Sequence, residues 1–100
     1  MLHPETGYAI NRREYDARGN VITESYFGVD GQPIIATEAN CASVRWEYDD
    51  IGNKVYWGYF DTKNEPITSS YSYASTTLEY DYDILKEQLY FDEAGNILTN

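Results

Sequence analysis

The chain has 100 residues, a length that predicts one domain or one short stack of repeats. Its 17 acidic and 7 basic residues give a net charge of -10, which disfavours nucleic acid and anionic membrane surfaces as partners. A mean hydropathy of -0.61 and the absence of a long apolar run exclude a transmembrane helix, which needs about 20 apolar residues.

Three similar segments account for much of the unusual content of 11 tyrosines. The segment that starts at Tyr8 aligns without a gap with one that starts at Cys41, and a third copy starts at Tyr73. A repeat period of about 20 to 50 residues is typical of stacked repeat proteins. We therefore predict a single repeat domain and expect it to be a segment or a close relative of a longer array. The units are approximately 1–33, 34–66 and 67–100, and they share Glu-Tyr-Asp triplets at 14–16, 47–49 and 79–81 and Tyr-Phe pairs at 26–27, 59–60 and 90–91.

The first unit contains two segments of β-forming residues separated by a turn signal. Residues 8–16 and 21–27 are predicted strands. Gly19 and Asn20 lie between them and tolerate the positive φ that a tight hairpin needs. A second turn signal ends at Pro33, which cannot donate to a strand ladder. The second unit has the same order of elements, so each unit is expected to form a β-hairpin.

The secondary structure of two kinds of segment is less clear from their own residues. The connections 34–40 and 67–72 are predicted to form either a third short strand or an extended crossover. Residues 83–89 are rich in helix formers and taken alone favour a short helix. The alignment with the other units favours a strand there instead, and the third unit lacks the Gly-Asn pair, which predicts a shorter or different hairpin.

The alternation of side chains along a strand assigns residues to the two faces of the predicted sheet. Large side chains fall on both faces of some strands, so the sheet is either covered on both sides or leaves an aromatic face open. The fold prediction is therefore all-β, with tandem hairpins in one twisted antiparallel sheet or a short solenoid. In the second unit Val44, Trp46 and Tyr48 share a face, as do Val55, Trp57 and Tyr59, whereas Tyr56 and Phe60 share the opposite face.

The strings YDARGN and YDDIGN, each followed by an apolar-rich strand and a Tyr-Phe pair, resemble the YD repeats of bacterial RHS-type proteins. They are also similar to the YDxxGN/YFDxxGxP repeats of surface proteins of Gram-positive gut bacteria, and more loosely to MORN and cell-wall-binding repeats. The resemblance covers roughly residues 8–98, although RHS-type units are shorter and the Gly-Trp of cell-wall-binding units is absent. It implies a hairpin array that serves as a scaffold or binding surface, usually outside the cytoplasm, without a catalytic residue.

The recurrent acidic residues have structural explanations. Asp16, Asp49 and Asp81 are expected to open turns by accepting hydrogen bonds from the backbone two residues on. Weak calcium binding is the alternative, although no EF-hand string is present and we predict no metal site. The recurrent glutamates are expected to form a ladder of exposed pairs with Arg12 and Arg45.

Nucleophilic catalysis has little support in the sequence. The only cysteine, Cys41, cannot form an internal disulfide, and the only histidine, His3, lies 38 residues away without a family signature around either residue. We therefore predict no enzyme activity and no cofactor.

The aromatic residues are the main candidates for function. Those at repeated positions are expected to be architectural, with Phe27, Phe60 and Phe91 forming the core. The others suit stacking on sugar rings or on a protein partner. The predicted function is a non-catalytic binding or adhesion module for a polysaccharide or a protein; the alternative is a structural spacer without a ligand. Exposed sheet edges also predict self-association. The candidate binding residues are Trp46, Tyr56, Trp57, Tyr71 and Tyr82.

Overall fold

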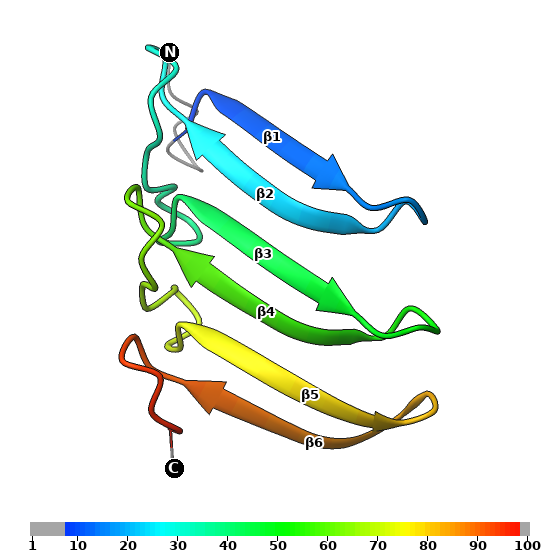
Figure 1. The fold of residues 1–100 in the computed structure, drawn as a ribbon. Coiled ribbons are helices and arrows are strands. Elements are labelled where there is room, and N and C mark those ends of the chain that lie inside the picture. The colour runs from blue at the N-terminus through cyan, green and yellow to red at the C-terminus, as the bar shows by residue number, and fades with distance from the viewer. Residues whose placement is uncertain (1–7, 99–100) are drawn as a thin grey trace.

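The computed structural model describes residues 8–98, which form six strands and no helix. Each strand pairs antiparallel with its neighbour in the chain, so the fold is one open sheet of three consecutive hairpins (Figure 1). This confirms the all-β prediction and the strand, rather than a helix, at 83–89. The strands are β1 (Ile10–Tyr15), β2 (Val21–Phe27), β3 (Ser43–Tyr48), β4 (Lys54–Phe60), β5 (Ser75–Asp81) and β6 (Ile84–Phe91).

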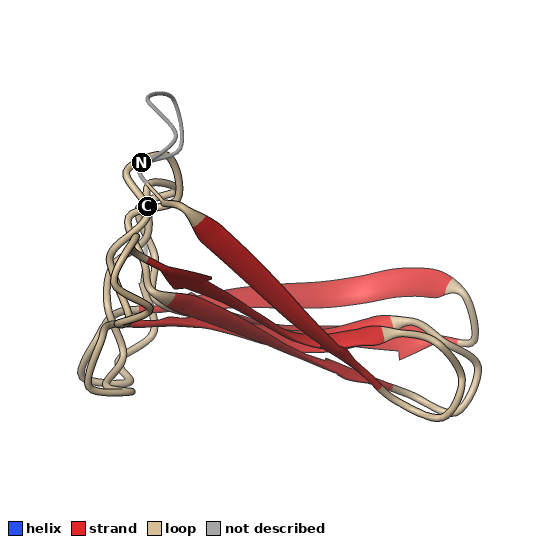
Figure 2. Cartoon of the chain, turned by 90° about the horizontal axis from the view of Figure 1, so that it is seen from above, coloured by secondary structure: helices blue, strands red, loops and turns tan. Residues whose placement is uncertain are grey.

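The sheet is a single twisted layer. Figure 2 shows the strands from above, with the hairpin turns at one end and the longer connections gathered at the other. The principal extents of 45 × 35 × 22 Å fit this flat shape. Within residues 8–98 no second layer covers either face, so side chains on the sheet must bury one another.

The first two hairpins close through turns that an aspartate organises. The carboxylate of Asp16 accepts hydrogen bonds from the backbone N–H groups of Arg18 and Asn20, each at 2.9 Å. Asp49 accepts the equivalent bonds from Ile51 and Asn53 at 3.1 and 2.8 Å. Both turns also contain a glycine with positive φ, which a residue without a side chain adopts most easily. The turn-opening role predicted for these two aspartates is therefore confirmed.

The third hairpin turns differently, as the missing Gly-Asn pair predicts. Asp81 pairs with Ile84, so only Tyr82 and Asp83 form the turn, and Tyr82 takes the positive φ of 63°. Asp81 belongs to β5, and its carboxylate lies 3.9 Å from Lys86 Nζ. The prediction that this aspartate opens a turn was wrong, because the shorter loop leaves no run of N–H groups beyond it.

At the opposite end of the sheet, similar turns follow β4 and β6. Asp61 accepts hydrogen bonds from the N–H groups of Lys63 and Glu65, and Asp92 from those of Ala94 and Asn96. Beyond each turn a single residue bridges back to the strand. These contacts stop short of a regular third strand, so the connections 34–40 and 67–72 are crossovers. The isolated bridges are Phe27–Pro33, Phe60–Pro66, Phe91–Ile97 and Ala36–Cys41.

Successive hairpins are joined by short ladders of three residue pairs between β2 and β3 and between β4 and β5. Each ladder continues into the preceding loop, where the N–H of Tyr26 donates to the carbonyl of Ala42 at 2.9 Å and that of Tyr59 donates to Ala74 at 2.8 Å. Both alanines are buried, with exposed fractions of 4% and 1%. A small, buried side chain therefore lies at each junction between hairpins.

The core lies on one face and is centred on the second hairpin. Cys41, Val44 and Tyr59 are buried there, with Tyr26 and Tyr73 among the partly buried residues packed against them. Tyrosine suits a thin layer because its ring can be buried while its hydroxyl reaches a polar partner.

Two predictions about the opposite face were wrong. Phe27 and Phe60 are half-buried rather than core, and the guanidinium groups of Arg12 and Arg45 lie over their rings at 5.1 and 4.2 Å. Within residues 8–98 the two ion pairs are Arg13–Glu24 and Lys86–Asp81, so the predicted Arg/Glu ladder does not form. The arginines pack on the phenylalanines because this face has no second layer to cover those rings. Phe91 is half-buried too.

The aspartate turns make the stability of the fold depend on pH. Hydrogen bonds from backbone N–H groups lower the pKa of Asp16, Asp61 and Asp92. A carboxyl with a lower pKa in the folded state stabilises the fold above its unfolded pKa, and this stability is lost as pH falls through the folded pKa. We expect the thermal midpoint, followed by circular dichroism, to fall as pH decreases below about 4, the ordinary pKa of aspartate.

A matched pair of variants within one turn tests the cause. Asp49→Ala should lower the thermal midpoint at pH 7 and flatten its acid dependence, because the turn loses its acceptor. Asp50→Ala, which changes the exposed neighbour, should do neither. Equal midpoints for the two variants would contradict the role of the turn carboxylate.

Candidate functional site

An open cleft of about 320 Å³ lies on the core face of the second hairpin, and we call it the aromatic cleft. Strands β3 and β4 supply its floor, and the connection between β4 and β5 supplies one wall. Five aromatic side chains line it. Its lining residues are Trp46, Lys54, Trp57, Tyr59, Tyr71 and Tyr73.

The floor is a pair of tryptophans. Trp46 and Trp57 are direct cross-strand partners on β3 and β4, and both are half-buried. The indole N–H of Trp57 donates to the hydroxyl of Tyr73 at 3.0 Å, which satisfies its polar edge within the protein. Lys54 Nζ lies 5.8 Å from the centre of the Trp46 ring, a cation–π distance that places a positive charge at the rim.

The wall is a tyrosine that projects from an ordered turn. Tyr71 is 65% exposed, and its ring centre lies 6.1 Å from that of Tyr59 and 6.5 Å from that of Tyr73. Ser69 holds this turn, since its hydroxyl donates to the carbonyl of Tyr73 at 2.8 Å and accepts from the N–H of Tyr71 at 3.2 Å. These two hydrogen bonds order the backbone that carries Tyr71.

The same register position carries different side chains in the three hairpins. The pair Trp46–Trp57 aligns with the ion pair Arg13–Glu24 in the first hairpin and with Leu78–Gln88 in the third. The sheet therefore forms without an aromatic pair at this position. The tryptophans are thus additional to what the hairpin architecture needs.

Three of the five predicted binding residues meet in the aromatic cleft, namely Trp46, Trp57 and Tyr71. Tyr56 lies on the opposite face. Tyr82 is 80% exposed but lies at the β5–β6 turn, where its carbonyl accepts a hydrogen bond from Asn53.

Sequence reasoning missed three members of the cleft. Lys54 carries no aromatic signal, and Tyr59 and Tyr73 occupy repeated positions, which predict an architectural role. Burial strongly raises the pKa of the Tyr59 phenol, so that hydroxyl stays neutral. The available signal was the Tyr-Ser-Tyr string at 71–73, which places two aromatics in a connection otherwise rich in Ser and Thr.

Tyr56 has a packing role on its own face. Its ring crosses Gly58, and a Cβ atom added to that glycine would lie 3.1 Å from Tyr56 Cζ and closer still to its hydroxyl. A tyrosine ring that covers a strand glycine shields the exposed backbone. The glycine on β4 is thus explained by the neighbouring ring.

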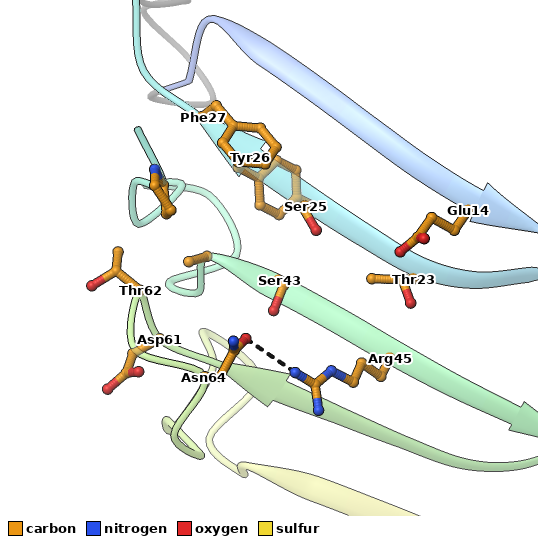
Figure 3. Close-up of a pocket in the computed structure, with 12 residues that line it drawn as sticks. Glu14, Thr23, Ser25, Tyr26, Phe27, Ser43, Arg45, Asp61, Thr62 and Asn64 are labelled. Atoms are coloured by element: carbon orange, nitrogen blue, oxygen red, sulfur yellow. Dashed lines mark hydrogen bonds between the residues drawn. The ribbon is translucent and has the colours of Figure 1, made fainter. Parts of the chain in front are cut away.

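A second hollow of about 340 Å³ lies on that opposite face, between the first and second hairpins (Figure 3). Its lining is mostly polar and includes Thr23, Ser25 and Arg45. The Arg45 guanidinium is already engaged, because it donates to Asn64 Oδ1 at 3.0 Å and lies over the Phe60 ring. Ser43 Oγ, which also lines this hollow, is buried without a hydrogen-bond partner among the described residues.

The described residues give no arrangement for metal or nucleophilic chemistry. Within 8–98, no group of three or more His, Cys, Asp or Glu side chains is placed to hold a metal ion. Cys41 is fully buried, and desolvation followed by the charge of Glu24 raises the pKa of its thiol to about 11. His3 lies outside the described residues. The described part of the chain also contains no helix that could cross a membrane.

Comparison of the chain with protein-family models, curated proteins and solved structures returned no match. The resemblance to YD-type repeats therefore stays a prediction from sequence. The geometry of the aromatic cleft is the feature from which a function can be inferred.

The state of Cys41 gives a direct test of the core. A buried, protonated thiol should react with a soluble disulfide reagent at pH 8 at least about a hundredfold more slowly in the folded protein than in urea. Spectrophotometric titration of the thiol measures both rates. Rapid reaction in the native state would contradict the burial of Cys41.

The contact between Tyr56 and Gly58 predicts a specific coupling. Gly58→Ala should destabilise the protein by about 1 kcal/mol because the ring must move. In a Tyr56→Ala background the same change should cost nothing or stabilise, since alanine is preferred to glycine in a strand. Urea unfolding of the four proteins in this double-mutant cycle measures the coupling. Equal costs in both backgrounds would show that the ring does not occupy this place.

Proposed function

We propose that this protein is a non-catalytic binding module that recognises a polysaccharide through the aromatic cleft. The observation that carries the proposal is the Trp46–Trp57 pair beside the exposed Tyr71 at a position where the other hairpins have no aromatic pair. The C–H groups on the face of a sugar ring carry partial positive charge, which the negative face of an aromatic ring attracts.

The polar rim of the aromatic cleft supports a sugar ligand. Sugar hydroxyls need hydrogen-bond partners, and Lys54 together with the hydroxyls of Tyr71 and Tyr73 lies at the same hollow. The net charge of -10 favours a neutral or basic glycan, because an acidic polymer would be repelled. A neutral glycan or an amino sugar polymer is therefore the preferred class.

The size of the cleft favours a glycan over a folded protein partner. A stable protein interface buries about 800 Å² on each side. The cleft holds about 320 Å³. That volume suits one or two sugar residues of a chain, with further residues running along the sheet.

The proposal extends to the architecture and the location. Each hairpin is one copy of a unit of about 33 residues, in an array of three units of bacterial YD type displayed at the cell surface. Support comes from the equivalent bulges after Glu14, Glu47 and Glu79, in addition to the sequence resemblance. In such an array the unit with the tryptophan pair would be the specialised one.

A structural spacer without a ligand is the second candidate. It is favoured by the partial burial of Trp46 and Trp57 and by the use of the Trp57 N–H within the protein. In that case the tryptophans serve only to widen a thin core.

Binding to insoluble polysaccharides distinguishes the two functions. Chitin, cellulose and peptidoglycan are incubated with the protein, and bound protein and tryptophan fluorescence are measured. Tyr71→Ala and Trp57→Ala should each weaken binding about tenfold or more, which corresponds to about 1.4 kcal/mol for a central aromatic contact.

The matched controls are Tyr56→Ala on the opposite face and Tyr82→Ala at the far turn, which should bind as the wild type does. Tyr71 is the most informative position because an exposed loop residue can be truncated without disturbing the core. Failure of the wild type to bind any glycan would favour the spacer, and equal losses in all four variants would contradict the aromatic cleft as the site.

A further inference from the structure

The two junctions between hairpins have a common geometry. In each, the N–H of the tyrosine in the Tyr-Phe pair donates across to an alanine carbonyl, Tyr26 to Ala42 and Tyr59 to Ala74. The same alanines donate their own N–H groups back into their hairpins, Ala42 to Phe60 at 2.8 Å and Ala74 to Phe91 at 2.9 Å. Each alanine thus connects two hairpins, with its N–H on one side and its carbonyl on the other.

The outer edge of β1 carries the same element, and no other strand of residues 8–98 pairs with it. The N–H of Ala9 donates to the carbonyl of Phe27 at 2.9 Å, as the other two alanines do in their hairpins. Because the Ala42 and Ala74 carbonyls accept from the preceding hairpin, we infer from their equivalence that the Ala9 carbonyl points outward. Ala9 is exposed, whereas Ala42 and Ala74 are only 4% and 1% exposed.

The outer edge of β6 carries the other half of the junction. The Tyr90 carbonyl accepts a hydrogen bond from Leu98 at 2.8 Å, as the Tyr59 carbonyl does from Ile67 at 3.1 Å. By the same register its N–H points outward, to a side where the described chain has no further strand. Tyr90 is 39% exposed against 7% for Tyr59.

We propose that these two edges join head to tail, so that β6 of one copy of the chain pairs with β1 of a second copy. Placing Tyr90 opposite Ala9, as Tyr59 lies opposite Ala74, fixes the register. The three residue pairs of the new ladder are Glu87 with Arg12, Gln88 with Asn11, and Leu89 with Ile10.

The side chains of this ladder are complementary. Glu87 and Arg12 are both exposed and of opposite charge, and they would be direct cross-strand partners. Ile10, which is 42% exposed, would cover the half-buried Leu89 on the same face. An ion pair and an apolar pair thus meet in a register that was set only by the internal junctions.

The aromatic core would also continue across the new junction. Within its own hairpin, Tyr73 lies 4.8 Å from Tyr90, and it reaches across the junction to Tyr59 at 5.7 Å. Tyr8 lies 4.8 Å from Tyr26 in the equivalent place of the first hairpin. In a second copy, Tyr8 would therefore lie beside Tyr90 of the first and bury its exposed ring.

Pairing of two β1 edges is less favourable than pairing of β1 with β6. Two β1 edges in antiparallel contact would bring Arg12 and Arg13 of each copy together. Joining β6 to β1 repeats the internal junction and leaves the same two edges free at the ends. Such a heterologous contact does not close, so it gives an open series of oligomers rather than a fixed dimer.

Sedimentation velocity over a range of protein concentrations tests this proposal. The salt concentration should be about 0.15 M, because the Debye length is then about 8 Å and repulsion between the net charges of two chains is largely screened. The weight-average mass of the wild type should rise continuously as the protein concentration is increased to about 1 mM, as expected for a small interface. Arg12→Glu and Glu87→Arg should each weaken association about tenfold, because an opposite-charge pair becomes a like-charge pair.

Mixing the two variants gives the decisive measurement. The glutamate introduced by Arg12→Glu in one chain then faces the arginine introduced by Glu87→Arg in the other. Where β6 of the Arg12→Glu chain meets β1 of the Glu87→Arg chain, the unchanged Glu87 and Arg12 face each other. Both kinds of mixed junction thus carry an opposite-charge pair, so the mixture should recover wild-type association.

Two kinds of further variant accompany the mixture. The matched controls are Lys63→Glu and Glu38→Arg, which make the same charge changes at exposed loop positions and should leave association unchanged. Ala9→Lys provides a second blocking variant, because a long side chain enters the close approach between the two edges.

A wild type that stays monomeric at the highest concentration would overturn the proposal. So would association that survives Ala9→Lys, or a mixture of Arg12→Glu and Glu87→Arg chains that associates no better than either alone. Thermal unfolding of each variant identifies any that fails to fold, and the mixing result rests only on variants that fold.

Discussion

The hydrogen bond from a tyrosine N–H to an alanine carbonyl at each hairpin junction is the contact on which the sheet depends. Each hairpin by itself is a two-stranded ribbon, which is marginally stable in water. The ladders between hairpins contain only three residue pairs, and Ala42 and Ala74 let the backbones approach there. Because these ladders fix the register, they also decide which side chains meet across a junction.

The single-layer sheet explains which side chains form the core. With no second layer over either face of residues 8–98, the buried surface must come from large side chains that lie across the sheet. Tyr59 and its neighbours do this on one face, where ring centres are 5.7 to 6.1 Å apart. On the other face arginine stems and guanidinium groups cover phenylalanine rings. The high tyrosine content thus follows from the thinness of the fold.

The aromatic cleft depends on this architecture but is not required by it. On β3 and β4, Trp46 and Trp57 occupy the positions that the ion pair Arg13–Glu24 occupies in the first hairpin. Tyr71 adds a third ring from a connection that belongs to no strand. The cleft therefore comes from a few side chains on a backbone that the other hairpins share.

The sequence by itself determined the strands, the turns opened by Asp16 and Asp49, and the shorter third turn, because these rest on contacts a few residues apart and on the alternation of side chains. It also placed Trp46 and Trp57 each on a defined face of its strand. Only the tertiary structure decided that Tyr71 joins them, that Tyr56 covers Gly58 instead, and that the phenylalanines lie outside the core. Those outcomes depend on the path of the connections and on which face the crossovers fold over, and no local pattern encodes either.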